Sequence, residues 1–225
     1  MNGRVRPGVA VAAVALLGFV VVSLLFGFTV VSEEEEAAAN VEFDPALYVD
    51  GAWENIRTVV KDEAVDLAAI LREIEPDADG NVAKEDLLPV VEQYGLVTPG
   101  DAHMYKVTTT GMVTDVDIAT SKGTLGLQVD GYEGPIEVRT YVGRRIPSDD
   151  TSVRDATGLI SFGDFKEQTE YSRVGSEINK RVVADLADLD PDSLLGQEVQ
   201  ITGTFQMRTQ NRPQVPVSQL FLVPL

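Results

Sequence analysis

The spacing of hydrophobic residues divides the chain into an apolar N-terminal stretch, a helical region and a β-rich region. From Val9 to Val31 no residue carries a charge. A helix that spans a bilayer needs roughly 20 apolar residues, whereas the apolar part of a secretory signal runs about 7 to 15. The stretch therefore predicts a signal-anchor transmembrane segment over residues 1–32, which contacts the membrane through residues 9–31.

Charges on either side orient this segment. Arg4 and Arg6 precede it, and residues 33–36 are glutamates. Because basic residues favour the cytoplasmic side, we expect a single-pass protein of the cell membrane with a cytoplasmic N-terminus and an extracytoplasmic bulk. Cleavage before Asn40 is an alternative, since three alanines precede it. Glutamates between an apolar core and its cleavage site favour retention, and residues 33–43 are then an acidic spacer.

A helical period follows over residues 44–100. Asp44 and Pro45 are typical of a helix N-terminus, as an N-cap and a proline at the first helical position. One apolar stripe then recurs at intervals of three and four residues, as on an amphipathic helix. Its members are Trp53, Ile56, Val60, Ala64, Leu67, Leu71 and Ile74.

Residues 75–86 have the length and register of a calcium-binding loop. The chemistry differs, because Glu75 stands where such a loop has aspartate and Asp86 where it has a bidentate glutamate. A polar turn between two helices is the better interpretation, and no metal site is predicted.

From Tyr105 onward the hydrophobic period becomes the alternation typical of strands. Five stretches carry it: residues 105–118, 123–129, 135–142, 197–205 and 217–223. A long segment with a helical pattern separates the third from the fourth, which is the order of the five-stranded OB barrel. We therefore expect an α+β fold with an OB-like barrel domain over residues 103–225. Gly111 and Gly203 are expected where its strands bulge or approach closely.

The segment between the third and fourth strands, residues 152–182, is called the signature segment below. Apolar residues at helical spacing predict a helix that covers the end of the barrel, and Asp164 with Glu167 resembles a capping box. Two interpretations of its polar residues remain open: a buried hydrogen-bonded network, which we favour, or a ligand or partner site. These residues are Arg154, Asp155, Asp164, Glu170 and Asn179.

Alternation along the second and third strands predicts which side chains face outward. If Leu125 and Leu127 face the core, Gln128 faces out. The same argument on the next strand places Glu137, Arg139 and Tyr141 outside. One aromatic and three polar groups would suit a sugar or another small molecule, since some OB barrels bind on this face. An ordinary solvated sheet face is the alternative.

Charge and composition exclude several classes of function. The formal net charge is −18, which argues against nucleic-acid partners because these are held mainly by Lys and Arg. The chain has no cysteine, so disulfides and thiolate chemistry are excluded. His103, the single histidine, is expected in a linker as an exposed or locally bonded side chain. Without a Ser-His-Asp arrangement or a phosphate-binding glycine loop, we predict no enzyme activity and no cofactor.

Three stretches carry a resemblance to a known family: FDPALYVDGAWENI, SVRDATGLISFGDFKEQTEYSRVGSEINKRV and GQEVQITGTF. They are similar to the uncharacterised bacterial family of predicted periplasmic lipoproteins known as domain of unknown function 2291, over roughly residues 41–223. The resemblance implies export. It also implies an accessory role at the cell envelope, because some members are encoded beside sugar transport systems of the ATP-binding-cassette (ABC) type.

This chain departs from that family at one place. Members usually carry a lipobox cysteine, whereas the corresponding residues here read LLFGFTVVSEEEE. A retained membrane-spanning helix would replace the acyl anchor with stronger insertion. We therefore expect a membrane-anchored extracytoplasmic accessory or interaction module with an envelope protein as partner, associated with a sugar ABC transport system. The alternative is a small-molecule or saccharide-binding OB module.

Overall fold

The computed structural model describes residues 43–225, of which Asp44–Leu225 form one compact unit. The predicted anchor over residues 1–32 lies outside the described residues, as does all of the predicted spacer except Phe43. Within residues 43–225 no helix combines the length and the apolar composition that crossing a membrane requires.

The predicted helix N-terminus at Asp44 is confirmed. Helix α3 (Pro45–Asp62) begins directly after it, and the backbone N–H groups of Ala46 and Leu47 donate to Asp44 Oδ1 at 2.9 and 3.2 Å. The apolar stripe is buried as expected except for the half-buried Ala64, but it is divided between two helices, and Ala64 and Ile74 lie outside both. Strand β1 (Val65–Asp66) interrupts it before α4 (Leu67–Arg72), because β1 pairs in parallel with the first long strand of the sheet.

The region predicted as helical also contains short strands. After α4 come β2 (Asn81–Ala83), α5 (Lys84–Tyr94) and β3 (Gly95–Val97), and β2 pairs with β8 (Gln214–Pro216). The predicted polar turn is present, but it joins α4 to strand β2 instead of joining two helices. Its centre is Asp77, whose Oδ1 accepts hydrogen bonds from the N–H groups of Asp79 and Asn81 at 2.9 and 2.8 Å.

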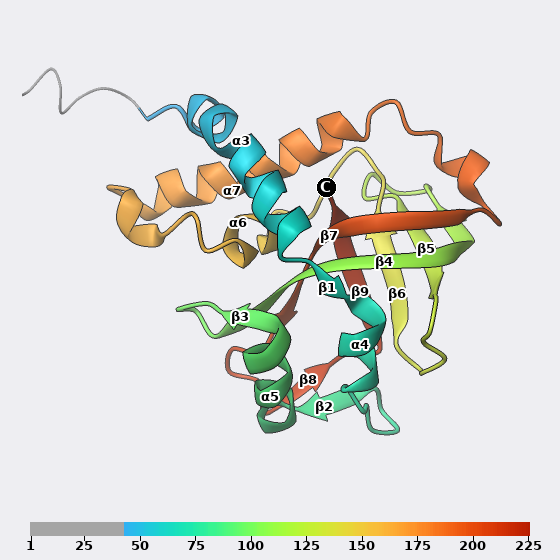
Figure 1. Ribbon diagram of the computed structural model, residues 1–225. Helices are drawn as coiled ribbons and strands as arrows, with labels where there is room; N and C mark the ends of the chain where they lie inside the picture. The colour runs from blue at the N-terminus through green and yellow to red at the C-terminus, as the bar shows by residue number, and fades with distance from the viewer. Residues whose placement is uncertain (1–42) are drawn as a thin grey trace, which may run out of the picture. The chain divides into compact units, whose positions relative to one another are not determined.

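The predicted order of five strands with a helical segment between the third and fourth is also confirmed. The strands are β4 (Ala102–Asp117), β5 (Thr124–Val129), β6 (Glu137–Tyr141), β7 (Glu198–Arg208) and β9 (Gln219–Pro224). Long strand β4 pairs with β7 through its first part and with β5 through its second, so the sheet coils strongly (Figure 1). Strands β7 and β9 pair through only two residue pairs, Gly203 with Pro224 and Thr204 with Val223.

Close approach of strands explains both predicted glycines. A Cβ at Gly111 would meet the carbonyl group of Gln128, and one at Gly203 would meet that of Val223. The core lies inside the coiled sheet, where the rings of Tyr105 and Phe205 stack with centroids 4.6 Å apart.

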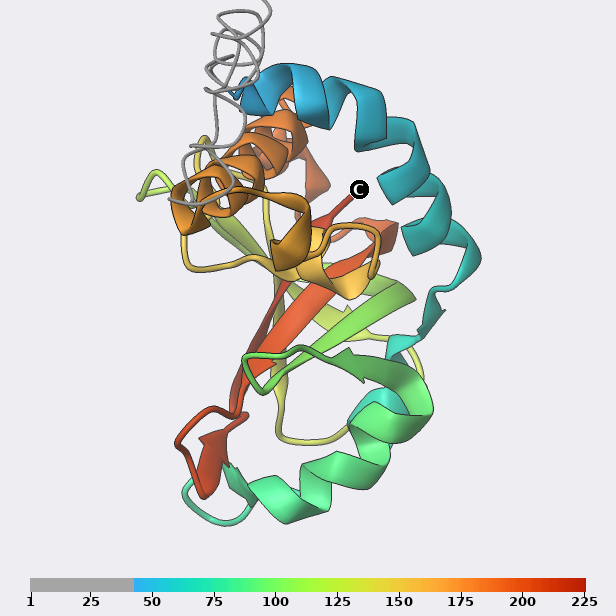
Figure 2. The same cartoon turned by 90° about the vertical axis from the view of Figure 1, so that its left-hand side faces the viewer.

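The signature segment forms α6 (Ser152–Ala156), a 3-10 turn (Phe162–Asp164) and α7 (Gln168–Asp185). Helices α3 and α7 lie side by side on one side of the sheet, whereas α4 and α5 lie on the other (Figures 1 and 2). The stripe of α7 is buried at Val174, Ile178 and Val182. Helix α7 packs against α3 and α6, and α6 makes the contact with β4 and β7. Within the signature segment the helix that contacts the sheet is therefore mainly α6, which differs from the expectation for α7, and α3 contacts β4 and β7 as well.

The expectation for His103 was wrong. This residue lies inside β4 and is fully buried, because the strand begins at Ala102, where β3 and β7 pair with its first residues. Neither ring nitrogen has a hydrogen-bond partner among the described residues. Burial lowers the pKa of His103, an effect that the nearby Asp101 carboxylate opposes.

Candidate functional site

Alternation along β5 and β6 places the predicted binding residues on one face of the sheet, called the outer face below. Leu125, Leu127, Val138 and Thr140 are buried in the core as expected. Gln128, Glu137, Arg139 and Tyr141 therefore share the opposite face, and β9 extends it because Arg139 is the cross-strand neighbour of Phe221.

Arg139 forms the centre of the outer face and is 12% exposed. Its guanidinium donates to Asp115 Oδ2 at 2.6 Å, to Glu137 Oε1 at 2.7 Å and to Thr124 Oγ1 at 2.9 Å. The hydrogen bond from Arg139 is the main cause that lowers the pKa of Glu137. Gly126 leaves room for this arrangement, because a Cβ there would lie 3.4 Å from Arg139 Nη1. Glu137 and Arg139 are thus in contact, as their shared face suggested.

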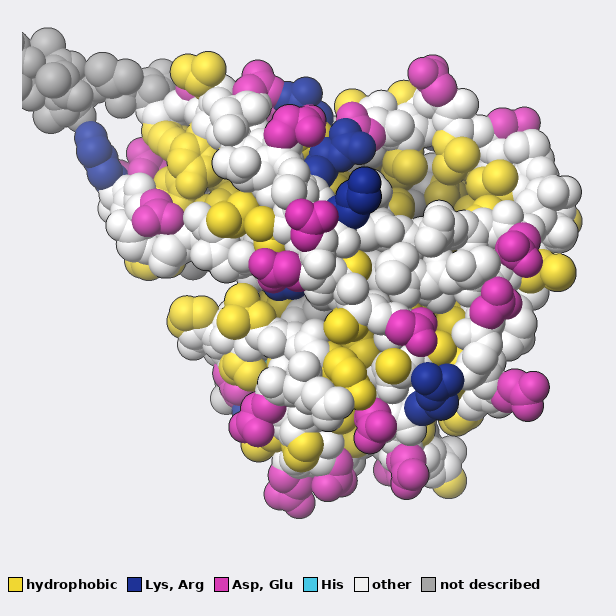
Figure 3. Space-filling view, viewed as in Figure 1, with side chains coloured by type: hydrophobic (Ala, Val, Ile, Leu, Met, Phe, Trp, Pro, Cys, Tyr) yellow, Lys and Arg dark blue, Asp and Glu magenta, His cyan; other side chains and the backbone are white. Residues whose placement is uncertain are grey.

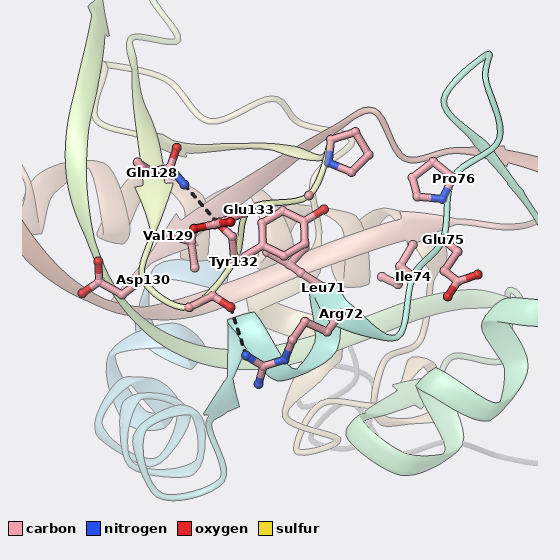
Figure 4. A pocket seen from close by; sticks show the side chains of 13 residues that line it. Leu71, Arg72, Ile74, Glu75, Pro76, Gln128, Val129, Asp130, Tyr132 and Glu133 are labelled. Atoms are coloured by element: carbon pink, nitrogen blue, oxygen red, sulfur yellow. Dashed lines mark hydrogen bonds between the residues drawn. The ribbon is translucent and has the colours of Figure 1, made fainter.

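Gln128 lies apart from this cluster. Its amide donates to the carbonyl oxygen of Tyr132 at 2.9 Å, at the edge of a wide hollow of about 830 Å³ between α4 and the β5–β6 connection. Figure 4 shows Tyr132 in the middle of this hollow, between Gln128 and Ile74, with Arg72 reaching toward the backbone. The Arg72 guanidinium donates to the carbonyl oxygen of Gly131 at 3.0 Å. The structure therefore does not bring Gln128 together with Arg139.

Tyr141 is on the outer face but is not exposed, which corrects the sequence expectation. It is 6% exposed because its ring stacks on Phe221, with centroids 5.4 Å apart, and because residues 147–150 lie beside it. Burial raises the pKa of Tyr141, and the carboxylates of Asp150 and Asp149 add to that effect.

A hollow of about 350 Å³ opens beside Tyr141, where β7 and β9 separate. It is called the Asp150 hollow below, and its lining includes Lys122, Tyr141, Asp150, Arg208, Arg212 and Phe221. A second hollow of about 870 Å³ continues from it along the outer face to Asp115 and Arg139. The two share Lys122, Gln219 and Phe221. Sequence analysis missed Asp150, which lies in a connection without periodicity.

Two of the polar residues of the signature segment form a buried network. Arg154 and Asp155, 8% and 10% exposed, make a bidentate pair of 2.7 and 3.0 Å. Tyr171 completes it: its hydroxyl donates to Asp155 Oδ1 at 2.8 Å, and the Arg154 guanidinium carbon lies 3.6 Å from its ring centroid. Gly175 gives the space, because a Cβ there would lie 3.1 Å from Arg154 Nη1. These contacts support the interpretation as a structural network.

The other three polar residues lie elsewhere. Asn179 is buried and donates to the carbonyl oxygen of Asp150 at 2.9 Å, so α7 holds the connection after β6. Asp164 and Glu170 make exposed local contacts, accepting from the N–H groups of Ser161 and Lys166 at 2.8 and 2.9 Å. The capping box is therefore formed by Ser161 and Asp164 around the 3-10 turn, instead of by Asp164 and Glu167 before α7.

An apolar patch lies where the signature segment meets the short strand β3. It consists of Leu96, Val97, Leu159 and Phe162, which are 39%, 42%, 46% and 55% exposed. Gly158 brings the two segments together, because a Cβ there would lie 4.0 Å from Leu96 Cδ2. Figure 3 shows hydrophobic side chains on the left of the molecule, over the signature segment and over β3, on both sides of a notch. Sequence analysis missed this patch because its two halves are far apart along the chain.

Aromatic rings connect the patch to the start of α3. Phe162 packs edge-on against Tyr171 with centroids 5.7 Å apart, and Phe165 lies 5.6 Å from the same ring. Tyr48 of α3 lies 5.3 Å from Phe165. Among residues 43–225, no group of three or more His, Asp or Glu side chains is placed to hold a metal ion.

Comparison with known proteins assigns the family. The model of a family described as a predicted periplasmic lipoprotein, domain of unknown function 2291, matches residues 18–219, so the chain belongs to this family. No curated protein matches the chain. The crystal structure of an OB-fold protein from Thermotoga maritima is similar, with a TM-score of 0.58 and 15% sequence identity over 81% of this chain and 97% of that one. This likeness shows the OB fold.

Proposed function

We propose that this member of the predicted periplasmic lipoprotein family is an interaction module, tethered to the outer side of the cell membrane by residues 9–31. The family description supports an extracytoplasmic, membrane-associated protein. The chain has no cysteine that could carry an acyl chain, whereas residues 9–31 are long and apolar enough to span a bilayer. Binding rather than catalysis is the activity of the described unit.

The apolar patch carries this proposal. Scattered exposed hydrophobic residues are normal, but exposed hydrophobic residues that two segments bring close together are typical of a surface that another protein covers. Phe162 is the most exposed member of the patch, and its ring packs against Tyr171 of α7. Phe165, beside the same Tyr171 ring, contacts Tyr48 of α3. The partner is an envelope protein, and the family resemblance suggests a component of a sugar ABC transport system.

Site-specific photo-cross-linking in intact membranes tests the patch. Gly163 follows Phe162, and a Cβ at this position would meet nothing within 4 Å, so a photoreactive residue fits there without a clash. Gly51 on α3 offers the same free space and serves as the control position. We expect a discrete cross-linked protein from position 163 and none from position 51.

Substitutions then connect the cross-link with the apolar side chains. Phe162→Ser with Leu159→Ser is expected to abolish it, whereas Leu195→Ser, which changes a leucine of 56% exposure outside the patch, is expected to leave it intact. A cross-link that survives the double substitution would contradict the role of the patch.

The outer face supports a second candidate function, the binding of a small molecule or saccharide. The supporting observation is the pair of adjoining hollows between the connections β4–β5 and β7–β9, with polar side chains and the Tyr141 and Phe221 rings in their lining. OB folds bind oligosaccharides and oligonucleotides near these two connections. The net charge of −18 disfavours oligonucleotides. A screen of neutral oligosaccharides against the full chain tests this candidate.

A further inference from the structure

Asp150 is a buried carboxylate that the surrounding structure fixes on three sides. It is 5% exposed, and its backbone N–H donates to the carbonyl oxygen of Pro147 at 2.9 Å. Its Oδ1 accepts from both the N–H and the hydroxyl of Ser152, at 3.1 and 2.7 Å. Asn179 of the signature segment holds its carbonyl group. The carboxylate therefore has one orientation, in the lining of the Asp150 hollow.

One oxygen of this carboxylate has no hydrogen-bond partner among residues 43–225. No hydrogen bond reaches Oδ2 from any described residue, and Asp150 forms no ion pair within residues 43–225. Burial raises the pKa of Asp150, because the desolvation of its charge outweighs the hydrogen bonds from Ser152 and the attraction of Arg208. Oδ2 is not among the fully buried polar atoms without a partner in residues 43–225, so the side chain is buried while this oxygen stays accessible. An acceptor that is held in place in the lining of a hollow and has no protein partner is available to a ligand.

The rings of Tyr141 and Phe221 and the Tyr141 hydroxyl line the same hollow as this acceptor. The Tyr141 and Phe221 rings are nearly parallel, at 17°, and the more exposed ring is that of Phe221. The Tyr141 hydroxyl makes no hydrogen bond with the described residues and is not among their fully buried atoms without a partner, so it stays accessible from the hollow. A ring face, a free hydroxyl and a free carboxylate oxygen thus line one hollow.

The charges around the hollow restrict the ligand. Arg208 is occupied by Asp149, with 2.8 Å between its Nη2 and Asp149 Oδ2. Lys122 and Arg212 also line the hollow, and neither forms an ion pair with the described residues. The carboxylate of Asp150 would repel an anion in the hollow, and the side chains of Lys122 and Arg212 would repel a cation. The hydroxyl groups of a neutral molecule can donate hydrogen bonds to the carboxylate and accept them from the cationic side chains. Such a molecule can also place an apolar face on Phe221.

We propose that the Asp150 hollow binds one unit of a neutral saccharide, with Asp150 Oδ2 accepting from sugar hydroxyls, the Tyr141 hydroxyl completing the hydrogen bonds and Phe221 covering the sugar ring. The volume of about 350 Å³ is in the range of small-molecule sites. Because the second hollow of about 870 Å³ adjoins it, further units of an oligosaccharide extend toward Arg139. This inference rests on the second candidate function.

The test uses the full chain in a detergent without a sugar headgroup, since an alkyl glycoside would compete. An array of neutral, acidic and amine-bearing oligosaccharides provides the probes, and calorimetry of the strongest neutral binder provides the affinity. Tyr141→Phe keeps the ring stack and removes the hydroxyl, so we expect a roughly 5- to 10-fold weaker affinity, the size of one lost hydrogen bond. Asp150→Asn and Phe221→Ala are expected to weaken binding at least 10-fold.

Controls separate binding from folding. Asp130→Asn changes an exposed aspartate outside the hollow and is expected to bind normally. The raised pKa of Asp150 means that its charge costs stability at neutral pH, so Asp150→Asn is expected to melt no lower than the unchanged chain. If the Asp150→Asn variant unfolds, the affinity of the Tyr141→Phe variant alone decides whether the hollow binds the saccharide.

Each result has one consequence. A preference for charged saccharides, or binding unchanged by Tyr141→Phe and Asp150→Asn, overturns the inference. In the second case, loss of binding in Arg139→Ala would still support the second candidate function on the remaining outer face. No binding to any saccharide would overturn both.

Discussion

Two arginines with similar partners serve different regions of the molecule. Arg139 on the outer face and Arg154 in the signature segment are 12% and 8% exposed, and each bonds to a carboxylate at 2.6 to 2.7 Å. The carboxylates differ. Those bonded to Arg139 are 55% and 50% exposed, whereas Asp155 is 10% exposed. Breaking a buried pair leaves a charge without solvent, but breaking a half-exposed one lets water replace the lost partner.

This difference separates a network that maintains the fold from one that stays open to a ligand. The Arg154 network joins α6 to α7 and leaves little access from solvent. The Arg139 network lies open along a hollow, where the carboxylates of Asp115 and Glu137 can still accept further hydrogen bonds.

Arg154→Ala is expected to give the largest effect. It leaves Asp155 buried without its cation, so the free energy of unfolding should fall by about 3 to 5 kcal/mol. Urea denaturation measures this, with Arg173→Ala, an exposed arginine of α7, as the control. Partner cross-linking should decline only as far as folding does. An unchanged urea midpoint with abolished cross-linking would instead place the partner site within residues 152–170.

Tyr171→Phe tests the same network with a smaller change. It removes the hydroxyl that donates to Asp155 and keeps the ring beneath Arg154, so we expect a loss of about 0.5 to 1.5 kcal/mol. Tyr94→Phe is the control, because the Tyr94 hydroxyl has no hydrogen bond among the described residues. A loss as large as that of Arg154→Ala would show that the hydroxyl, rather than the ion pair, maintains the network.

Arg139→Ala is expected to cost about 0 to 1 kcal/mol, since both of its carboxylates are half-exposed. The measurement is the urea midpoint at low and high salt, and the small loss should shrink further as salt screens the pairs. A loss similar to that of Arg154→Ala would remove the contrast between the two regions.

The smallest expected effect is a change in stability at acidic pH. The pKa of Glu137 is lowered in the folded state, so its contribution to stability is present above its ordinary value of 4.5 and is lost as the pH falls through the lower folded value. The stability difference between the unchanged chain and Arg139→Ala should therefore shrink below about pH 4.5. Denaturation series at pH 7 and at about pH 3 to 4 test this expectation, which a constant difference would contradict.

Sequence periodicity predicted features that depend on near neighbours. Alternation in β5 and β6 assigned the core and outer faces correctly, because the period of two follows from strand geometry alone. The cap at Asp44 is likewise a local hydrogen bond. The strand order followed from the positions of β-branched runs and the helical pattern between them.

Features that depend on distant residues could not be predicted in this way. Tyr141 is buried because Phe221, in the last strand, stacks on it. His103 is buried because β3 and β7 both pair with the start of β4. Arg154 and Asp155 are adjacent in sequence, but their burial depends on contacts with Tyr171 and Gly175 of α7. The apolar patch likewise requires β3 to meet Gly158.

The buried imidazole of His103 also gives this protein a built-in spectroscopic reporter. Because the chain has one histidine, its ring C–H groups give a single pair of signals in a proton NMR spectrum, with no assignment problem. The pKa of the ring is lowered from 6.5, so these signals should stay at their neutral positions as the pH falls through that value. The unfolded chain takes up a proton there and the folded chain does not, so stability also declines. A titration of these signals with a midpoint near 6.5 would therefore show that the junction between β3, β4 and β7 has opened. Because the signals come from this one ring, they report on this junction alone.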